Sequence, residues 1–278
     1  MTDKNYEKVS LIYDYLMQSV DYEAFADYME AINTRLNFTP QVILDLACGT
    51  GGSTLPLAAR GYRVVGLDVS EEMLAAAKEK ACRLKLQAEF IRGDMRTFTL
   101  SQPVDMAVIF QEGLNYLLSS QDVLKTFHRI FKALSPGGVF AFDLHALPLL
   151  PTGSGEVSMV EEDNFTLIWQ SRYQPEEALW EIALTGFVKE GSGLYERFQE
   201  THRERHYSPA EITGLLQEAG FSLQGIYKSF TFEEDLNARR LFVVARKGKG
   251  EKVASEEKES EEKALEEMEG EAGELRKG

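Results

Sequence analysis

The sequence has few cysteines, no long apolar run and a shortage of positive charge. Cys48 and Cys82 are the only cysteines among 278 residues, which argues against a disulfide framework and favours a reducing compartment. No apolar run approaches the roughly 20 residues that a membrane-spanning helix needs. Residues 1–6 lack the apolar core of a signal peptide. We therefore expect a cytoplasmic globular protein without a membrane partner.

Acidic residues outnumber basic ones by 45 to 30, which gives a net charge of −15. This balance disfavours nucleic acid as a partner, because nucleic-acid binding depends on Lys and Arg at the phosphates, although a local basic patch stays open. Residues 247–278 hold eleven glutamates and seven Lys or Arg, and no aromatic residue. Such a segment buries too little apolar surface to offset its ordering entropy. We expect 247–278 to be an acidic, disordered tail.

The most informative segment is 42–52, Val-Ile-Leu-Asp-Leu-Ala-Cys-Gly-Thr-Gly-Gly. An apolar run typical of a buried strand contains Asp45 near its end and passes into small residues. A helical run at 53–60 and a second apolar strand at 64–67 follow, and Asp68 ends that strand. This order predicts half of a nucleotide-binding sheet. The glycines allow a ligand to approach the backbone, the helix start offers free N–H groups, and Asp68 can accept both hydroxyls of a ribose.

The spacing of the small residues distinguishes two kinds of cofactor. A dinucleotide fingerprint reads Gly-x-Gly-x-x-Gly, but Thr54 stands where the third glycine would be. The sequence reads instead Asp45-x-Ala47-x-Gly49-x-Gly51, which resembles the first motif of the class I S-adenosylmethionine-dependent methyltransferases. A dehydrogenase is a rival interpretation that the missing glycine disfavours. An ordinary strand-to-helix turn without a ligand is another alternative.

Alternating strands and helices predict an α/β protein with a doubly wound, Rossmann-like sheet. Ser135-Pro136-Gly137-Gly138 is expected to be a sharp stop between a helix and a strand. Helices are expected at 6–18, 22–36, 53–60, after Ser70, at 121–134 and at 209–219, and strands at 42–46, 64–68, 88–92, 104–110, 139–144, 221–230 and 239–245. The resemblance implies seven strands in this sheet, with the last one antiparallel to the rest.

The alternation changes after His145. β-rich runs at 165–173, 178–188 and 193–206 have no helix between them, which predicts an antiparallel β insertion after the fifth strand. We expect five segments in all: an N-terminal helical lid (1–40), the cofactor-binding core (41–150), the insertion as a substrate cap (151–207), the end of the core sheet (208–246) and the tail (247–278).

The resemblance covers about residues 1–246, and within the family the chain looks most like a bacterial branch of small methyltransferases. That branch begins with a helix carrying Tyr-Asp-x-Leu-Met, which is 13–17 here, and has a later segment similar to 200–208. The likeness implies an enzyme that uses S-adenosyl-L-methionine to methylate a small molecule. The acceptor atom (oxygen, nitrogen or carbon) stays open. Methylation of RNA or protein, and a non-catalytic cofactor-binding protein of the same fold, are the alternatives.

The likeness also implies which residues hold each part of the cofactor. They are Asp45, Ala47, Gly49 and Gly51 for the methionine part, Asp68 for the ribose, Val69, Met73, Asp94 and Met95 for the adenine, Gln111 beside the sulfonium, and Tyr13 as a closing lid. No carboxylate cluster indicates a metal.

A general base is needed only where the acceptor must lose a proton. His145 is the preferred catalytic candidate, because the carboxyl ends of strands face the ligand crevice. The other candidates are Glu112, His202, His206 and Tyr207. A set of aromatic residues either lines an apolar pocket or forms the core of the insertion: Tyr116, Phe165, Trp169, Tyr173 and Trp180.

Overall fold

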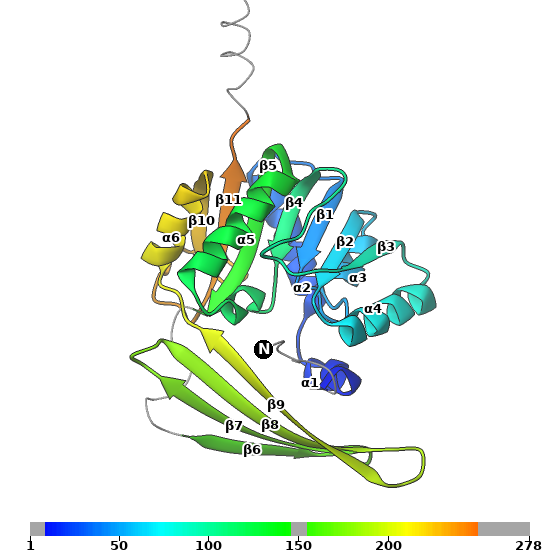
Figure 1. Cartoon of the computed structure of the whole chain (residues 1–278). Coiled ribbons are helices and arrows are strands. Elements are labelled where there is room, and N and C mark those ends of the chain that lie inside the picture. The colour runs from blue at the N-terminus through cyan, green and yellow to red at the C-terminus, as the bar shows by residue number, and fades with distance from the viewer. Residues whose placement is uncertain (1–8, 146–154, 250–278) are drawn as a thin grey trace, which may run out of the picture. The chain divides into compact units, whose positions relative to one another are not determined.

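Seven strands form one sheet in the computed structural model, which describes residues 9–145 and 155–249 (Figure 1). The strands are β1 (Val42–Leu46), β2 (Arg63–Asp68), β3 (Ala88–Arg92), β4 (Val104–Ile109), β5 (Leu134–His145), β10 (Phe221–Lys228) and β11 (Arg240–Lys247). Their order is β10-β11-β5-β4-β1-β2-β3. The strands from β3 to β5 are parallel, and β11 is antiparallel to both of its neighbours. The expected Rossmann-like sheet with an antiparallel last strand is confirmed.

Helices cover both faces of this sheet. They are α2 (Tyr22–Arg35), α3 (Thr54–Ala59), α4 (Glu71–Leu84), α5 (Ser120–Ala133) and α6 (Pro209–Glu218). Phe25 and Met29 of α2 and Leu57 of α3 pack in one hydrophobic cluster, whereas Phe127 of α5 and Leu216 of α6 pack in another. Among residues 9–145 and 155–249, no helix is long and apolar enough to cross a membrane.

Three serines begin helices, Ser70 among them at the start that the sequence predicts. Ser70, Ser119 and Ser208 each accept a backbone N–H of the first turn, at 3.1–3.2 Å, and so satisfy one of the donors that a helix start leaves without a partner. At its other end α4 stops at Lys85, which has a positive φ of 56°. These local signals place helix starts in the structure close to their predicted positions.

The strand β5 is longer than predicted. It begins at Leu134, which pairs with Val104, and the pairing is irregular before it resumes between Met106 and Val139. A Cβ on Gly138 would lie 2.9 Å from the carbonyl oxygens of Asp105 and Ser135, so only glycine fits there. The predicted stop at 135–138 is therefore an irregularity within β5, because the glycine lets two backbones approach closely.

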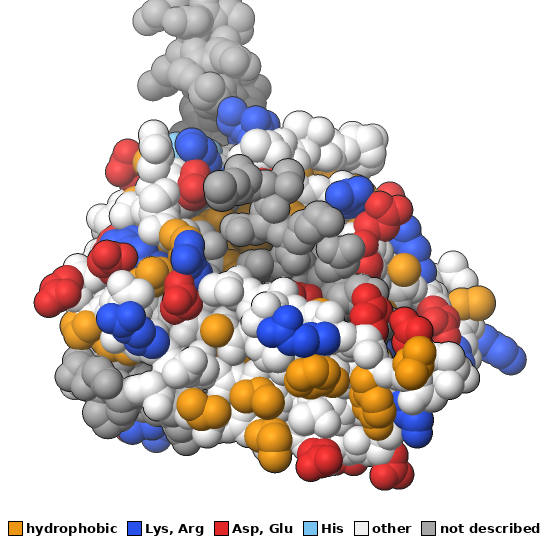
Figure 2. All heavy atoms as spheres, turned by 60° about the horizontal axis from the view of Figure 1, so that its bottom comes forward, with side chains coloured by type: hydrophobic (Ala, Val, Ile, Leu, Met, Phe, Trp, Pro, Cys, Tyr) orange, Lys and Arg blue, Asp and Glu red, His pale blue; other side chains and the backbone are white. Residues whose placement is uncertain are grey.

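A second, antiparallel sheet of four strands follows β5. Its strands are β6 (Glu156–Glu161), β7 (Phe165–Gln174), β8 (Leu179–Lys189) and β9 (Tyr195–Arg205), paired in that order. Three of these strands match the predicted β-rich runs. Figure 2 shows hydrophobic side chains gathered over the part of the surface that this sheet forms, and Val157 and Met159 are 62% and 60% exposed. The antiparallel insertion expected from the sequence is confirmed.

The N-terminal segment differs from the prediction. In place of one helix over 6–18, the described part contains a 3₁₀ turn, η1 (Val9–Leu11), and a single turn of α-helix, α1 (Tyr13–Leu16). Val9 and Ile12 are buried against Phe165 and Phe198 of the four-stranded sheet. Since so short a helix is not stable alone, these tertiary contacts determine its conformation. Residues 1–8, 146–154 and 250–278, with most of the predicted tail, lie outside the described residues.

Candidate functional site

A cleft of about 340 Å³ lies at the carboxyl edge of the seven-stranded sheet, where β1, β2 and β4 end. Nine of the eleven predicted cofactor residues line it: Tyr13, Ala47, Gly49, Asp68, Val69, Met73, Asp94, Met95 and Gln111. Asp45 and Gly51 do not. The cleft is completed by residues that the sequence did not single out for the cofactor: Arg96, Phe110, Gly113, Tyr116, Leu117, Leu118 and Asp122.

The turn after β1 uses left-handed backbone at three alternate positions. Ala47, Gly49 and Gly51 have φ values of 55°, 54° and 82°. A Cβ on Gly49 would meet nothing nearer than the Tyr13 ring at 4.0 Å, whereas one on Gly51 would lie 3.3 Å from the Cβ of Ala77. Gly49 therefore leaves open space in the cleft, and Gly51 allows α4 to pack closely against the turn.

Asp45 lies beneath the turn and not in the cleft. Its Oδ2 accepts hydrogen bonds from the hydroxyls of Ser53 and Thr54, at 2.7 and 2.6 Å. Its Oδ1 is buried and has no hydrogen-bond partner in the described part of the chain. Burial raises the pKa of Asp45 to about 6. The carboxylate thus fixes the start of α3 to the end of β1.

Asp68 holds the turn from the end of β2. Its Oδ2 accepts the Gly49 N–H at 2.8 Å, and its Oδ1 accepts the Ser70 N–H at 2.9 Å. Each oxygen keeps a further lone pair for another donor. Burial raises the pKa of Asp68, and the backbone hydrogen bonds oppose that shift. Val69, the next residue, lines the cleft and is 56% exposed.

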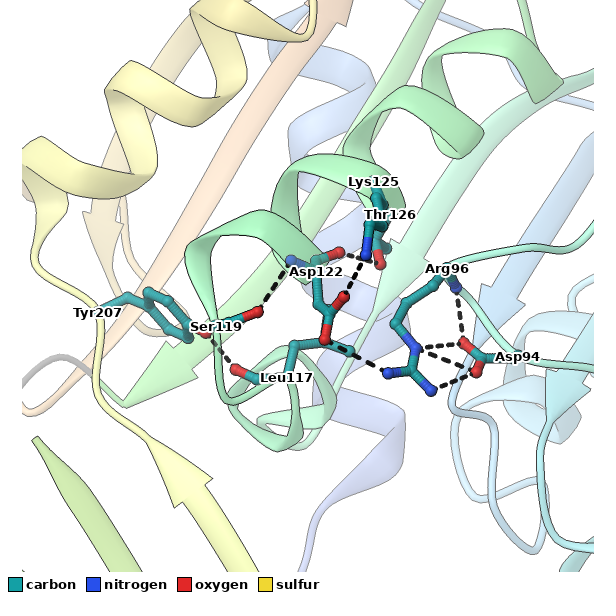
Figure 3. Close-up of polar contacts among 8 residues, drawn as sticks. All are labelled: Asp94, Arg96, Leu117, Ser119, Asp122, Lys125, Thr126 and Tyr207. Carbon is teal, nitrogen blue, oxygen red and sulfur yellow. Dashed lines mark hydrogen bonds and ion pairs between the residues drawn. The ribbon is translucent and has the colours of Figure 1, made fainter. Parts of the chain in front are cut away.

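Asp94 is held by an arginine that the sequence did not indicate. Figure 3 shows Arg96 between Asp94 and Asp122. Its Nη2 lies 2.6 Å from Asp94 Oδ2, its Nε 3.0 Å from both oxygens of Asp94, and its Nη1 3.4 Å from Asp122 Oδ2. These hydrogen bonds lower the pKa of Asp94. Asp122 also pairs with Lys125 at 3.0 Å, so the network joins the loop after β3 to α5.

The turn after β4 is conformationally unusual. Gln111 and Glu112 are consecutive residues with positive φ, 53° and 57°, which costs energy for non-glycine residues and is frequent at functional sites. The Nε2 of Gln111 is buried, and it has no hydrogen-bond partner within 9–145 and 155–249. A Cβ on Gly113 would lie 2.9 Å from the Cβ of Ala47, so glycine lets this turn meet the glycine turn. The 3₁₀ turn η2 (Gly113–Tyr116) follows.

His145, the preferred base candidate, does not line the cleft but lies behind the turn after β4. Its Nε2 is 3.2 Å from Glu112 Oε1, and Arg240 Nε is 2.8 Å from the same oxygen. Burial opposes protonation of His145, but the hydrogen bond and charge of Glu112, with the charge of Glu204, raise its pKa above the usual value. Burial, with the charge of Glu112, also raises the pKa of Asp143 to about 7.

The other base candidates, Tyr207, His202 and His206, do not line the cleft either. Tyr207 is buried, donates its hydroxyl to the Leu117 carbonyl and lies under the Arg205 guanidinium, so it packs in the core. His202 lies 3.4 Å from both Tyr116 Oη and Glu200 Oε2. Burial, with the charge of His145, lowers the pKa of His206 to about 4. His206 is therefore neutral near pH 7.

The five aromatic candidates separate into two groups. Phe165 and Trp169 belong to the cluster that packs on η1, so they form part of the core of the insertion. Tyr116 lines the cleft, and Tyr173 and Trp180 lie near His206, with ring centroids 5.2 and 6.3 Å from its ring. Of the five, Tyr116 alone lines the cleft and Phe165 and Trp169 belong to the insertion core, while Tyr173 and Trp180 line neither of the two clefts.

The N-terminal segment is attached to the glycine turn by Asp14. Its Oδ1 accepts the Thr50 hydroxyl at 2.6 Å, and Lys80 Nζ lies 2.8 Å from both of its oxygens. These bonds place Tyr13 over Gly49. Asp14 belongs to the Tyr-Asp-x-Leu-Met pattern at 13–17, but no local feature of the sequence indicates its partners.

A second cleft of about 480 Å³ opens at the opposite edge of the sheet, near Arg63, Glu89 and Gln102. None of the predicted site residues lines it. Chemistry is therefore expected at the carboxyl edge, in agreement with the rule that ligands of open α/β sheets bind outside the carboxyl ends of the strands.

Comparisons with known proteins agree with this geometry. A family model described as a methyltransferase domain matches residues 43–138. The chain is 34% identical over 247 residues to a Bacillus subtilis (strain 168) protein named "Putative methyltransferase YqeM", over 88% of this chain and 98% of that protein. It is 26% identical over 238 residues to a dTDP-3-amino-3,4,6-trideoxy-alpha-D-glucopyranose N,N-dimethyltransferase of Streptomyces venezuelae, over 84% and 95% of the two chains.

A solved structure extends the likeness to three dimensions. The S-adenosylmethionine-dependent methyltransferase from Clostridium acetobutylicum ATCC 824 superposes with a TM-score of 0.76 at 25% identity, over 87% of this chain and 99% of that one. The fold is that of a class I methyltransferase. The chain belongs to the family of S-adenosylmethionine-dependent methyltransferases.

Proposed function

We propose that this protein binds S-adenosyl-L-methionine in the carboxyl-edge cleft and transfers its methyl group to a small-molecule acceptor. One observation carries the proposal: nine residues from five separate parts of the chain, each with an expected role toward this cofactor, line a single cleft. When bound, S-adenosylmethionine supplies a methyl group that its positively charged sulfur activates for displacement.

The residues of the cleft fit this molecule. The lone pairs left on Asp68 suit two ribose hydroxyls, and the exposed side chain of Val69 offers an apolar surface to the adenine, with Met73 and Met95 beside it. The unpartnered Nε2 of Gln111 is a donor directed at no described residue. A ligand that brings hydroxyls, an aromatic ring and an acceptor atom would satisfy all three features.

The methionine part would lie along Ala47 and Gly49, where Gly49 leaves open space. The unpartnered Oδ1 of Asp45 would support this end through a water molecule, since Asp45 does not reach the cleft. Asp94 would accept the adenine amino group and would share its oxygens with Arg96, which already binds both of them. Gly51 would act only through the packing of α4.

We assign the N-terminal segment as a lid and the four-stranded sheet as the substrate cap. Tyr13 lines the cleft above Gly49, and α1 contacts the glycine turn through Asp14 while η1 packs on the four-stranded sheet. A segment joined to both sides of a cleft by short contacts is suited to close over a bound cofactor. We assign His145 as the base where the acceptor must lose a proton.

A small-molecule acceptor is supported by the relative from Streptomyces venezuelae, whose name gives a sugar nucleotide as its substrate. The net charge of −15 adds to this, because it disfavours RNA. Acceptor recognition would use the inner face of the four-stranded sheet, from which Tyr173 and Trp180 extend toward His206.

Calorimetric titration of the purified chain with S-adenosylmethionine, S-adenosylhomocysteine and NAD tests the proposal. We expect micromolar binding of the first two and none of NAD. If neither S-adenosylmethionine nor S-adenosylhomocysteine binds to protein that is folded and free of co-purified ligand, the assignment of the cleft is ruled out. Binding of NAD alone would instead favour a dehydrogenase-type cofactor.

A further inference from the structure

The turn after β4 has a backbone conformation that its own residues do not favour. The Gly113 N–H donates to the Phe110 carbonyl at 3.3 Å and closes a turn of four residues. Both central residues, Gln111 and Glu112, have positive φ, as in a type I′ turn, which normally takes Asn, Asp or Gly at these positions. Since neither Gln nor Glu adopts this conformation readily, contacts from elsewhere in the fold hold the turn.

Those contacts reach Glu112 from the last strand of the sheet. Arg240 is the first residue of β11 and pairs with His145 at the end of β5, because β11 is antiparallel to β5 and so begins at the carboxyl edge. Arg240 Nε lies 2.8 Å from Glu112 Oε1, and His145 Nε2 lies 3.2 Å from the same oxygen. The side chain of Glu112 keeps only 14% of its surface accessible, so water screens these contacts weakly.

Asp143 of β5 holds the arginine in place. Its side chain is fully buried, its Oδ2 accepts a hydrogen bond from Arg240 Nε at 2.6 Å, and Arg240 Nη2 pairs with the same oxygen. The guanidinium also lies 5.2 Å from the centre of the Phe25 ring. One planar group therefore serves Asp143 with two nitrogens and Glu112 with one of them, which the single nitrogen of a lysine cannot reproduce.

The other side of the same turn faces the cleft. Gln111 lines the cleft, and its Nε2 is buried without a hydrogen-bond partner in the described part of the chain. Buried amide nitrogens of folded proteins are nearly always hydrogen-bonded, so this nitrogen is available to a group that a ligand brings. Phe110 lines the cleft as well, whereas Glu112 and Arg240 do not. The charged cluster behind the turn therefore acts on the cleft through the turn and not by direct contact.

We propose that Arg240 is a positioning residue for the cofactor: through Glu112 it holds the left-handed turn that directs the Gln111 amide into the cleft. This inference rests on the proposed function and extends it to a residue of the last strand, to which no cofactor or base role has been assigned. An ion pair that only stabilises the fold would change the free energy of unfolding. A positioning residue changes the affinity for the ligand, and it does so only while Gln111 is present.

Calorimetric titration of the full chain with S-adenosylhomocysteine tests this dependence in the wild type, Arg240→Gln, Gln111→Ala and the double variant. We expect each single substitution to weaken binding about tenfold, the effect of losing one buried hydrogen bond. The double variant should bind at most about twofold more weakly than Gln111→Ala, because no amide is left to position. If Arg240→Gln weakens binding equally with and without Gln111, or does not weaken it at all, the positioning role is overturned.

Two further variants control for effects on the strand and on folding. Arg246→Gln makes the same change at the other end of β11, where Arg246 Nε donates to the Gly137 carbonyl at 3.0 Å, and it should leave the affinity at its wild-type value. An equal loss of affinity in Arg246→Gln would show a general effect of the strand and would also overturn the inference.

If Arg240→Gln does not fold, Arg240→Lys replaces it in the same comparison. It keeps the positive charge but not the planar group, so it should weaken binding in the presence of Gln111 and not in its absence. The same two results as for Arg240→Gln overturn the inference. A wild-type chain that does not bind S-adenosylhomocysteine contradicts the proposed function itself, whereas wild-type binding that does not respond to Arg240 contradicts this inference alone.

Discussion

The hydroxyl of Thr50 donates a hydrogen bond to Oδ1 of Asp14 at 2.6 Å, across 36 positions of sequence. The bond joins the glycine turn to α1. On its other side the same segment packs on the four-stranded sheet through Val9 and Ile12, and the Val9 N–H donates to Glu200 Oε1 at 3.1 Å. Residues 9–16 therefore link the two sheets beside the cleft.

Removing the Asp14 carboxylate should loosen the proposed lid without unfolding the protein. Asp14 is 56% exposed, so its pair with Lys80 contributes at most about 1 kcal/mol, and its hydrogen bond with Thr50 about 1 kcal/mol more. In Asp14→Ala we expect faster hydrogen exchange at Leu16 and Met17, whose N–H groups close the turn of α1. Glu79→Ala, which removes an exposed carboxylate next to Lys80, is the matched control. Equal exchange in both variants would show that Asp14 does not hold the segment.

Asp68 should be the cofactor-binding residue most sensitive to substitution. Asp68→Ala removes the acceptor of the Gly49 N–H and the oxygens assigned to the ribose, so we expect binding of S-adenosylhomocysteine to weaken by about 1–3 kcal/mol. Asp105 offers a matched control, because its Oδ2 also accepts two backbone N–H groups, from Gln41 and Val42, at the other edge of the sheet. Calorimetry should find normal affinity in Asp105→Ala. Unchanged affinity in Asp68→Ala would contradict the ribose assignment.

Asp45 should make the stability of the protein depend on pH in an unusual direction. Burial raises its pKa to about 6, above the value of about 3.9 for an unfolded chain. Between these values the folded state binds more protons than the unfolded state, so the stability that Asp45 contributes falls as pH rises through this window. A shift of about two pKa units corresponds to about 3 kcal/mol.

Asp45→Asn removes this titration and keeps an oxygen for Ser53 and Thr54. We therefore measure the free energy of unfolding of both proteins with urea, near pH 4 and near pH 7. The variant should gain stability relative to the wild type as the pH rises. If the difference in free energy of unfolding between the two proteins does not vary with pH, the prediction is wrong.

Glu112 should control the ionisation of His145. Five ionisable groups surround or adjoin this histidine: Glu112 after β4, Glu204 and His206 at β9, Arg240 on β11 and Asp143 on β5. The hydrogen bond and charge of Glu112 raise the pKa of His145 against the effect of burial. In Glu112→Gln we expect the NMR titration midpoint of His145 to move to lower pH.

The sign of the stability effect follows from the raised pKa. His145 stabilises the fold fully at pH values below its unfolded pKa, and this contribution disappears as pH rises through its folded pKa. Glu181→Gln, at a carboxylate that pairs with Arg203, is the control. A midpoint that stays at its wild-type value in Glu112→Gln would exclude Glu112 as the cause.

Local sequence patterns predicted those site residues that lie at the end of one strand or in the turn directly after it. Asp68 and Gly49 could be found because a buried strand, a glycine turn and a helix start occur in a fixed order, and parallel strands bring their carboxyl ends to one edge. Asp45 lies near the end of β1 as predicted, but its carboxylate binds Ser53 and Thr54 and does not line the cleft. Nothing in the local sequence indicates whether a carboxylate at this position faces a cleft or the helix behind it. The extent of β5 was missed because Gly137 and Gly138 are equally typical of a turn.

Contacts between distant residues could not be predicted. The pair of Arg96 with Asp122 and the bond of Thr50 with Asp14 depend on side-chain directions that follow only from packing. His145 at the end of β5 and Glu204 on β9 lie 4.0 Å apart although their strands belong to different sheets. The hydrophobic pattern of the sequence does not indicate how the two sheets pack against each other.

The sequence by itself determined the class of fold and the edge of the sheet where chemistry occurs, because apolar periodicity, glycine positions and acidic strand ends act over a few residues. The tertiary structure decided which carboxylates line the cleft and which support it from behind. These outcomes depend on burial and on distances of 2.6–4.0 Å between residues far apart in the chain, and such distances exist only once both sheets are packed.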